Sequence, residues 1–397
     1  MPIKTNSFKI SLLIIITQFI LAGCANTKSS AQASPPPLTL FSNQTQFKDF
    51  EVESYDEIFE LSDELKAQLV KNIPNKKPSM KTAKDLLHFI FNSANNNLDY
   101  QSGATLTANQ TFKQQNANCL SLSIMAFSMA EHLGLEANFQ RVFIPEYWAL
   151  ENGFNLLTSH INLKLQFDQT KFDGVQRLYD VSDGVVVDFD ANSRKEKFKT
   201  KEINKHTVAA MFYNNKGAIA MVNGRYNEAY HYLKSATKIA SRYSPAWGNL
   251  GILFRIKNQN SHAELAYQYA LELDPANNTA KGNLGILFEM TDRIEQAQVI
   301  KRELDAKRQS NPYYHIAKGN EAYVQKFYRE AISYYKKSTE LDRKLHEPYF
   351  GLARSFYQLG DYKKAKRYLK SAKKNAFFIE DINSYQGKIN SLNAMVN

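Results

Sequence analysis

The C-terminal half of the chain repeats one pattern of small and apolar residues every 34 positions. An alanine recurs at this interval, and the position twelve residues before it is small in every unit. The alanines are Ala229, Ala263, Ala297, Ala331 and Ala365, and the small residues are Gly217, Gly251, Gly285, Gly319 and Ala353. Because small side chains let two helices approach closely, each unit predicts a helical hairpin, and successive hairpins are expected to stack into a superhelix.

Five such units are predicted within residues 206–379, at about 210–243, 244–277, 278–311, 312–345 and 346–379. The chain ends with residues 380–397. Apolar side chains recur at helical spacing in this part, from Ile379 to Met395. This spacing predicts a helix that caps the last hairpin, which would otherwise leave an apolar face open to water.

The region 46–205 combines two other patterns. Amphipathic helices are predicted over Tyr55–Val70 and Thr82–Ser93, and a helix that is apolar all round is predicted from Cys119 to Leu133. Asn118 is suited to cap the start of this helix, and Gly134 to end it. Four β-like stretches follow, at Ala137–Ile144, Ser159–Phe167, Gln176–Val181 and Gly184–Phe189. The sequence therefore predicts an α+β domain followed by an all-α superhelix.

The first residues carry a targeting pattern. Two lysines precede the apolar stretch Ile10–Leu21, and its last residue begins the run Leu-Ala-Gly that leads to Cys24. A charged start, about a dozen apolar residues and small residues before a cut indicate a secretory signal. Residues 1–23 are therefore assigned to a signal peptide, and residues 24–45, rich in Ser, Gln, Ala and Pro, to a flexible tether.

The segment that ends at Cys24 resembles the lipobox of bacterial lipoproteins. In that family the cysteine is acylated and becomes the mature N-terminus, so the resemblance implies lipidation, including palmitate, at Cys24. Ala25 follows, where an aspartate is absent, and in that family this implies the outer membrane. The implied location is the cell envelope, anchored by lipid and facing the periplasm; an ordinary cleaved signal is the alternative.

Charge is unevenly distributed along the 397 residues, whose formal net charge is +11. Lys and Arg number 21 against 22 Asp and Glu in residues 1–207, and 29 against 17 in residues 208–397. A basic half can indicate nucleic-acid binding. Charges of both signs alternate along the helical segments, however, so solvated helix faces are favoured and no nucleic-acid partner is expected.

Cys119 is the candidate nucleophile of the middle region. A thiol at the start of a helix lies at the positive end of the helix dipole, which favours the thiolate. His160, at the start of a predicted strand, is a candidate base, and Asp188, within an apolar strand, needs a partner such as an imidazolium. Asp190 and Asp180 are rival choices for the acidic residue. The alternative is that Cys119 only packs in the core.

This order of cysteine at a helix start, histidine on a strand and aspartate on a later strand resembles the transglutaminase-like branch of the papain-type cysteine protease fold. The resemblance covers about residues 80–195. It implies Cys119 as the nucleophile, His160 as the general base and Asp188 as the orienting group. An acyl-enzyme intermediate formed from an amide would be resolved by water or by an amine.

The 34-residue units resemble tetratricopeptide repeats. The best unit carries Trp247, Leu250, Gly251 and Phe254 on its first helix and Ala263, Tyr267, Ala270 and Pro275 further on. The third and fourth units match less well at Lys301 and Leu304 and at Lys318 and Ala322, so looser packing or a partner contact is expected near their junction.

The tetratricopeptide resemblance also implies a concave surface lined by the first helix of each unit. Asn215, Asn249 and Asn283 occupy the same position on three successive first helices. An amide can both donate to and accept from the backbone of an extended peptide. These residues are therefore candidate peptide-binding groups, although asparagine is also common at this position.

Two functions follow. The first is a membrane-anchored periplasmic protein whose cysteine site acts on amide bonds while the repeats bind a protein or peptide partner. The second is a non-enzymatic adaptor lipoprotein with a relic domain. No cofactor or metal is expected, because His88 and the other histidines lack metal-ligand spacing and no glycine-rich phosphate loop occurs.

Overall fold

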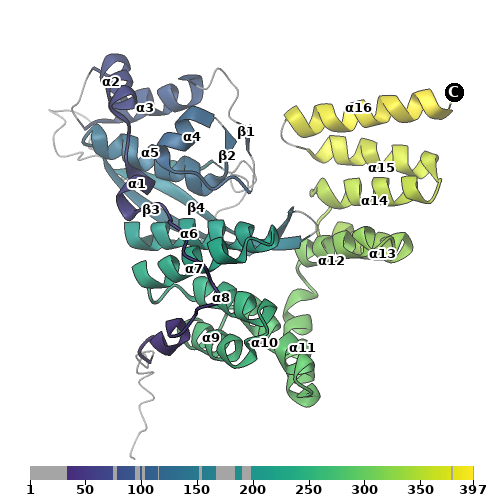
Figure 1. Cartoon of the computed structure of the whole chain (residues 1–397). Helices are drawn as coiled ribbons and strands as arrows, with labels where there is room; N and C mark the ends of the chain where they lie inside the picture. Colours follow the sequence, from purple (N-terminus) through teal and green to yellow (C-terminus); the bar gives the residue numbers. More distant parts are fainter. Residues whose placement is uncertain are drawn as a thin grey trace, which may run out of the picture. The chain divides into compact units, whose positions relative to one another are not determined.

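The computed structural model describes residues 34–74, 78–93, 99–100, 103–114, 116–151, 154–166, 184–189, 198–376 and 379–396. Residues Pro35–Asn397 form one compact unit. The described part is mostly helical, with a small antiparallel sheet (Figure 1). The signal peptide and Cys24 lie outside the described residues. No described helix has both the length and the apolar character needed to span a membrane.

Before the repeats, the described residues form six helices, and most of them pack against the last one. They are η1 (Leu38–Phe41), α1 (Tyr55–Phe59), α2 (Asp63–Asn72), α3 (Met80–Ser93), α4 (Ala108–Gln114) and α5 (Cys119–His132). Strands β1 (Asp99–Tyr100) and β2 (Asn116–Ala117) form a parallel pair.

The helix expected over Tyr55–Val70 is divided in two. Ser54 accepts a hydrogen bond from the backbone N–H of Glu57 and so caps α1, and Ser62 caps α2 in the same way from Leu65. Glu60 lies between them with an extended backbone. Ser62 therefore starts a second helix only eight residues after Ser54 starts the first. The apolar periodicity continues across this break and does not reveal it.

An antiparallel sheet of order β5-β4-β3-β6 packs against α5. Its strands are β3 (Glu136–Glu151), β4 (Phe154–Gln166), β5 (Gly184–Val187) and β6 (Thr200–Ile203). The prediction Gln176–Val181 lies outside the described residues, and β6 was not predicted. Its four residues are mostly exposed, so they carry little apolar signal.

The central strands are longer than the sequence prediction. The residues predicted as a connection between two strands continue the β3–β4 ladder, which pairs Tyr147 with Thr158 and Glu151 with Phe154 after a register shift beyond Val142. Asn152-Gly153, between the two strands, is a strong hairpin signal that the sequence prediction overlooked. We call the parts of β3 and β4 beyond the shift, 147–151 and 154–158, the arm.

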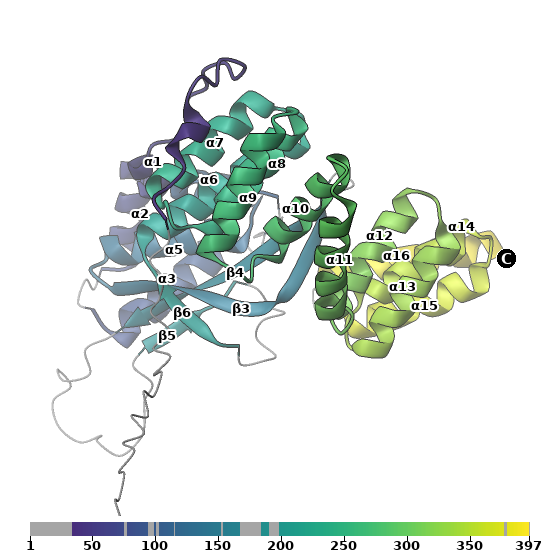
Figure 2. The same cartoon turned by 90° about the horizontal axis from the view of Figure 1, so that it is seen from below.

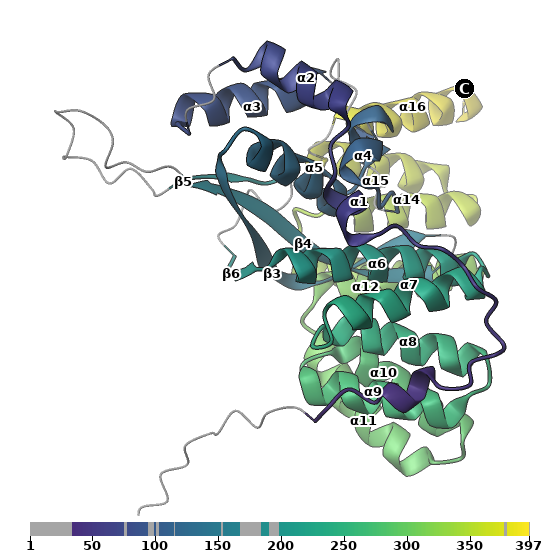
Figure 3. The same cartoon turned by 60° about the vertical axis from the view of Figure 1, so that its left-hand side comes forward.

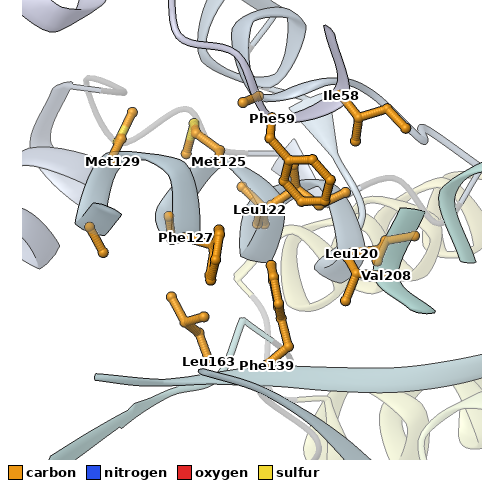
Figure 4. Close-up of a cluster of buried hydrophobic side chains, with 14 of the residues drawn as sticks. Ile58, Phe59, Leu120, Leu122, Met125, Phe127, Met129, Phe139, Leu163 and Val208 are labelled. Atoms are coloured by element: carbon orange, nitrogen blue, oxygen red, sulfur yellow. The ribbon is translucent and has the colours of Figure 1, made fainter. Parts of the chain in front are cut away.

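The core of this region surrounds α5, which is buried on all sides. Phe127 stacks on Phe139 of β3 with ring centroids 4.4 Å apart, and Ile58, Phe59 and Leu163 complete the packing (Figure 4). Val208 and the following apolar residues of α6, the first repeat helix, belong to the same cluster. The boundary predicted at 205/206 therefore does not separate two cores.

Five consecutive helical hairpins occupy the fully described stretch 205–375. They are α6 (Lys205–Val222) and α7 (Tyr226–Ile239), α8 (Ser244–Ile256) and α9 (Asn260–Leu273), α10 (Asn278–Met290) and α11 (Ile294–Arg308), α12 (Pro312–Val324) and α13 (Tyr328–Leu341), and α14 (Glu347–Gln358) and α15 (Tyr362–Asn375). Helix α16 (Ile379–Val396) packs on α15 through Tyr385, Ile389 and Leu392, as the capping prediction requires.

The apolar packing of the repeats is interrupted between the third and fourth hairpins. One cluster runs through the first three hairpins and ends at Ala297 and Ile300, and another begins at Ala322 in the fourth. Leu304 is buried in the third hairpin, where it faces Gly282. The arm approaches this junction, because β3 packs against α12 (Figures 1 and 2).

The predicted tether ends earlier than residue 45. Leu40 is fully buried, and Phe47 stacks on Tyr230 with ring centroids 4.2 Å apart. Figure 3 shows this N-terminal segment, Leu38–Glu53, running along α7, α8 and α9. Glu53 ends it by accepting hydrogen bonds from Lys216 and Tyr232. Residues 38–45, assigned to the tether from composition, are therefore packed on the repeats, because their apolar side chains find buried sites there.

Candidate functional site

Cys119 is the first residue of α5, where the sequence places it. The Asn118 side chain accepts a hydrogen bond from the Ser121 backbone N–H at 2.9 Å, which is the predicted N-cap. At the other end, Gly134 has a φ of +70°, a left-handed conformation that suits glycine after a helix. Helix α5 therefore starts at the cysteine for local reasons that are readable in the sequence.

A second set of contacts, not foreseen from the sequence, fixes the start of α5. Asn118 donates from Nδ2 to Thr105 Oγ1 at 2.9 Å, and its backbone N–H donates to the carbonyl of Ala104. Ser121 donates to the same carbonyl and accepts from the backbone N–H of Leu106. The segment 104–106 thus holds the helix start from one side, and no local motif marks these residues.

His160 lies on β4 and faces Asp188, which follows β5 directly. Its Nε2 donates to the two carboxylate oxygens of Asp188 at 2.9 and 3.0 Å. A carboxylate can only accept, so this contact assigns the proton to Nε2 in the neutral ring. The His160 side chain is 3% exposed and the Asp188 side chain 16%. The rival residues Asp180 and Asp190 lie outside the described residues.

The Cys119 side chain is the second partner of the His160 ring. The two side chains are hydrogen-bonded and interact electrostatically. Because Nε2 faces Asp188, Nδ1 is the ring nitrogen left for the sulfur. The structure thus brings together Cys119, His160 and Asp188 from a helix, a strand and a strand end.

The protonation of His160 is governed by opposing effects. Burial disfavours the imidazolium, but the hydrogen bonds to Asp188 and to Cys119, together with the negative charge near the ring, outweigh burial and raise the pKa of His160 to about 10. At neutral pH the ring is therefore held as a cation between the carboxylate and the sulfur.

Cys119 is buried but lies outside the main apolar cluster. Its neighbours Ala117, Leu120 and Leu122 belong to the main apolar cluster, whereas Cys119 does not, among the side chains that the structure describes. It is 8% exposed. Its backbone N–H lies in the first turn of α5, where a helix provides no internal acceptor. This N–H and a thiolate at the same residue are suited to an acyl-transfer reaction.

The arm joins the sheet next to His160. His160 pairs with Val142, and this is the last pair before the register shift that leads to the arm. A single residue of β4 separates His160 from Thr158, which already belongs to the arm. A continuous pair of strands therefore connects the candidate site with α12 of the repeats.

The predicted peptide-binding amides lie on the first helices of three hairpins, but two already bond within the repeats. Asn249 donates to Asn214 Oδ1 at 2.8 Å. Asn283 accepts from Arg255 at 3.2 Å and donates to a carbonyl of its own helix. Asn215 is half-buried on α6. Part of the hydrogen-bonding capacity of Asn249 and Asn283 is therefore used inside the array.

In the described part of the chain, no group of three His, Cys, Asp or Glu side chains is arranged to hold a metal ion.

Comparisons with known proteins identify the repeats. A tetratricopeptide repeat family model matches residues 346–376, which is the hairpin α14–α15. The prediction of tetratricopeptide repeats is confirmed by this match, which covers one of the five hairpins. None of the curated proteins compared with the chain matches it.

Solved structures also show similarity to the chain. One from the functional characterization of Pseudomonas aeruginosa pilF is 18% identical, with 49% of this chain and 92% of that chain covered and a TM-score of 0.28. YrrB, described as a TPR protein with an unusual peptide-binding site, is 16% identical over 46% of this chain and 94% of its own, with a TM-score of 0.25. The Cut9–Hcn1 hetero-tetramer of the APC/C is 19% identical over 42% and 34%, with a TM-score of 0.27.

Proposed function

We propose that this protein is a lipid-anchored enzyme of the cell envelope, with a transglutaminase-like cysteine site that acts on amide bonds of a partner bound by the repeats. The observation that carries the proposal is the His160 ring, bonded through Nε2 to Asp188 and in contact with the Cys119 thiol at the start of α5. A cysteine, an imidazole and an orienting carboxylate are the groups that covalent acyl transfer needs.

The proposed reaction has two halves. The Cys119 thiolate attacks the amide carbonyl and forms a C–S bond, while the backbone N–H at Cys119 stabilises the negative oxygen. The imidazolium of His160 then gives its proton to the leaving nitrogen, and the C–N bond breaks. In the second half, neutral His160 takes a proton from water or an amine, which attacks the thioester; the C–S bond breaks and Cys119 leaves as the thiolate.

Asp188 orients the ring in this scheme. By accepting from Nε2 it leaves Nδ1 to face the sulfur, and it stabilises the imidazolium throughout. The high pKa of His160, about 10, fits an imidazolium that can protonate the leaving nitrogen at neutral pH.

The partner of the repeats is proposed to be a protein or peptide on the concave surface. Tetratricopeptide arrays use such surfaces to hold extended segments. The contact of β3 with α12 supports a shared role, because a partner held near the fourth hairpin would lie on the element that the arm reaches. Lipidation at Cys24, and an outer-membrane location facing the periplasm, are proposed from the lipobox-like sequence alone.

The second candidate is a non-enzymatic adaptor. The burial of Cys119 and His160 favours it, since a substrate carbonyl must reach the sulfur. In this case the α5 region is only a docking surface, and the repeats provide the entire function.

Trapping of an acyl-enzyme separates the two candidates. The experiment uses the Cys24→Ser protein, in which Cys119 is the remaining cysteine. This protein is incubated with an activated acyl donor and analysed by intact mass spectrometry. The enzyme proposal expects one acyl group, absent in Cys119→Ala and strongly reduced in His160→Ala. A His231→Ala control, altering an imidazole that contacts the N-terminal segment instead, should acylate normally. Acylation that is equal in His160→Ala and wild type would favour the adaptor.

A further inference from the structure

Helix α15 holds the largest concentration of positive charge in the repeats. Its 14 residues include seven Lys or Arg and no Asp or Glu. These are Lys363, Lys364, Lys366, Arg367, Lys370, Lys373 and Lys374. Residues 208–397 carry 29 basic and 17 acidic residues, so this helix supplies more than half of that surplus of twelve. The alternation of charge expected for the repeats does not hold here.

Four of these residues form a straight line on the outside of the helix. Lys363, Arg367, Lys370 and Lys374 are all exposed and lie at positions i, i+4, i+7 and i+11, which share one helix face. At 1.5 Å per residue the line extends over about 16 Å. The opposite face, with Ala365, Leu369 and Ala372, is buried in the array. We call these four residues the basic row.

Among the described residues, no ion pair joins an acidic side chain to the basic row, although the charge of Asp361 acts on Arg367. Asp361, just before α15, forms its ion pair with Lys364, which is not part of the row. Arg367 lies over the ring of Tyr368 at 4.9 Å and also donates to its hydroxyl. Like charges three and four residues apart repel each other, so the row costs the helix stability that an external anion would restore.

The second helices of the other hairpins lack this row at the matching positions. Those positions are Asn227, His231, Lys234 and Lys238 on α7; Ser261, Leu265, Gln268 and Glu272 on α9; Glu295, Val299, Arg302 and Ala306 on α11; and Arg329, Ser333, Lys336 and Glu340 on α13. The repeat fold itself therefore does not require four cations here.

We propose that the basic row is a docking surface for an anionic phospholipid membrane. Four aligned cations on a rigid helix can contact several headgroup phosphates at once, and basic helix faces of this kind bind anionic lipids. Three of the four residues are lysines, which are depleted from protein–protein interfaces, so a membrane fits the row better than an acidic protein surface. A flat surface also suits a row on the outside of the array.

The choice of a membrane over other polyanions rests on the proposed lipid anchor. An anchored chain keeps α15 at a high local concentration of lipid, so a weak electrostatic contact is enough to orient the repeats. The proposed catalytic groups take no part in this contact.

Sedimentation with vesicles tests the inference on the full chain carrying Cys24→Ser, which removes any acyl chain at that residue. Vesicles of phosphatidylcholine alone are compared with vesicles that also contain phosphatidylglycerol, and the neutral vesicles report what the apolar segment Ile10–Leu21 contributes. Each Lys or Arg near an anionic membrane strengthens binding by roughly fivefold at low salt, so Lys363→Gln, Arg367→Gln, Lys370→Gln and Lys374→Gln together should weaken binding at least about tenfold. Added salt should weaken the wild type in the same direction.

A charge-matched control changes four exposed cations elsewhere, Lys238, Lys301, Arg302 and Lys307, to glutamine. This variant should retain most of the binding. Equal loss in both variants, or equal binding to neutral and anionic vesicles, would overturn the proposal. So would retention of a polyglutamate or an oligonucleotide without binding to anionic vesicles. Acylation of Cys119, measured on the same proteins, should be unchanged in the row variant, so the enzyme proposal and the membrane proposal can fail separately.

Discussion

Nε2 of His160 lies 2.9 and 3.0 Å from the two carboxylate oxygens of Asp188, although 28 residues separate them in the chain. Both groups are largely buried, and an unpaired carboxylate would be costly there. The pair therefore constrains how β4 and β5 align. It also decides which nitrogen of the imidazole ring, Nδ1, is left for Cys119.

Asp188→Asn should leave the fold in place but disturb the ring. The substitution removes the negative charge that stabilises the imidazolium, and an amide can donate to Nε2, which would leave a neutral ring with its proton on Nδ1. A ring in that state cannot act as a base through Nδ1. We expect acylation of Cys119 to slow by about a hundredfold or more. The rate of acyl-enzyme formation measures this effect. Asp63→Asn, at an exposed position on α2, should leave the rate unchanged; similar rates in both variants would remove Asp188 from the site.

The His160 pair should make stability depend on pH. Folding raises the pKa of His160 from 6.5 to about 10, so the folded state holds the proton more tightly. The resulting stabilisation is fully present below pH 6.5 and is lost as pH rises through about 10. Urea unfolding of wild type and His160→Gln should therefore show a difference in unfolding free energy that shrinks from pH 6 to pH 10. A constant difference would contradict the raised pKa.

Asn118→Ala should weaken both the helix start and the reactivity of Cys119. Loss of an N-cap costs about 0.5–2 kcal/mol, and the contact with Thr105 is lost as well. The matched control is Asn204→Ala, which removes the cap of α6. Both variants should unfold at lower urea, but only Asn118→Ala should slow the acylation of Cys119. If Asn204→Ala slows acylation equally, the effect reports general stability.

Substitution of Gly251 tests whether a hairpin needs a small residue where its two helices approach closely. A Cβ there would lie 2.5 Å from Cε1 of Tyr267, which is fully buried. Gly251→Ala should lower the free energy of unfolding by about 1–3 kcal/mol, because the ring has to move. Gly387→Ala, on α16 with no neighbouring atom within 4 Å, should instead raise it by about 0.5–1 kcal/mol. Urea midpoints compare the two; stabilisation by Gly251→Ala would contradict the packing.

The features that were predictable from sequence depend on local or periodic signals. Asn118 and Gly134 bound α5 through their own backbone preferences, and the 34-residue period located the hairpins. That His160 and Asp188 lie side by side was predictable only from their order in the chain and from the need of a buried carboxylate for a partner. Their roles in catalysis stay a prediction.

Other features depend on tertiary packing that no local pattern encodes. The core around Phe139 extends into α6 at Val208, so the predicted domain boundary does not divide it. Phe47 stacks on Tyr230, which is 183 positions away in the chain. The composition of the N-terminal segment cannot reveal so distant a partner, so it suggested a longer tether. The arm was signalled by Asn152-Gly153, and its contact with α12 was not.

The rate at which iodoacetamide alkylates Cys119 at neutral pH, in the Cys24→Ser background, tests the central claim most directly. An imidazolium beside the sulfur stabilises the thiolate, which is the reactive form. We predict that the wild type reacts faster than His160→Ala by about tenfold or more, and that Cys119→Ala does not react. Equal rates for wild type and His160→Ala would contradict the proposed pair of Cys119 and His160.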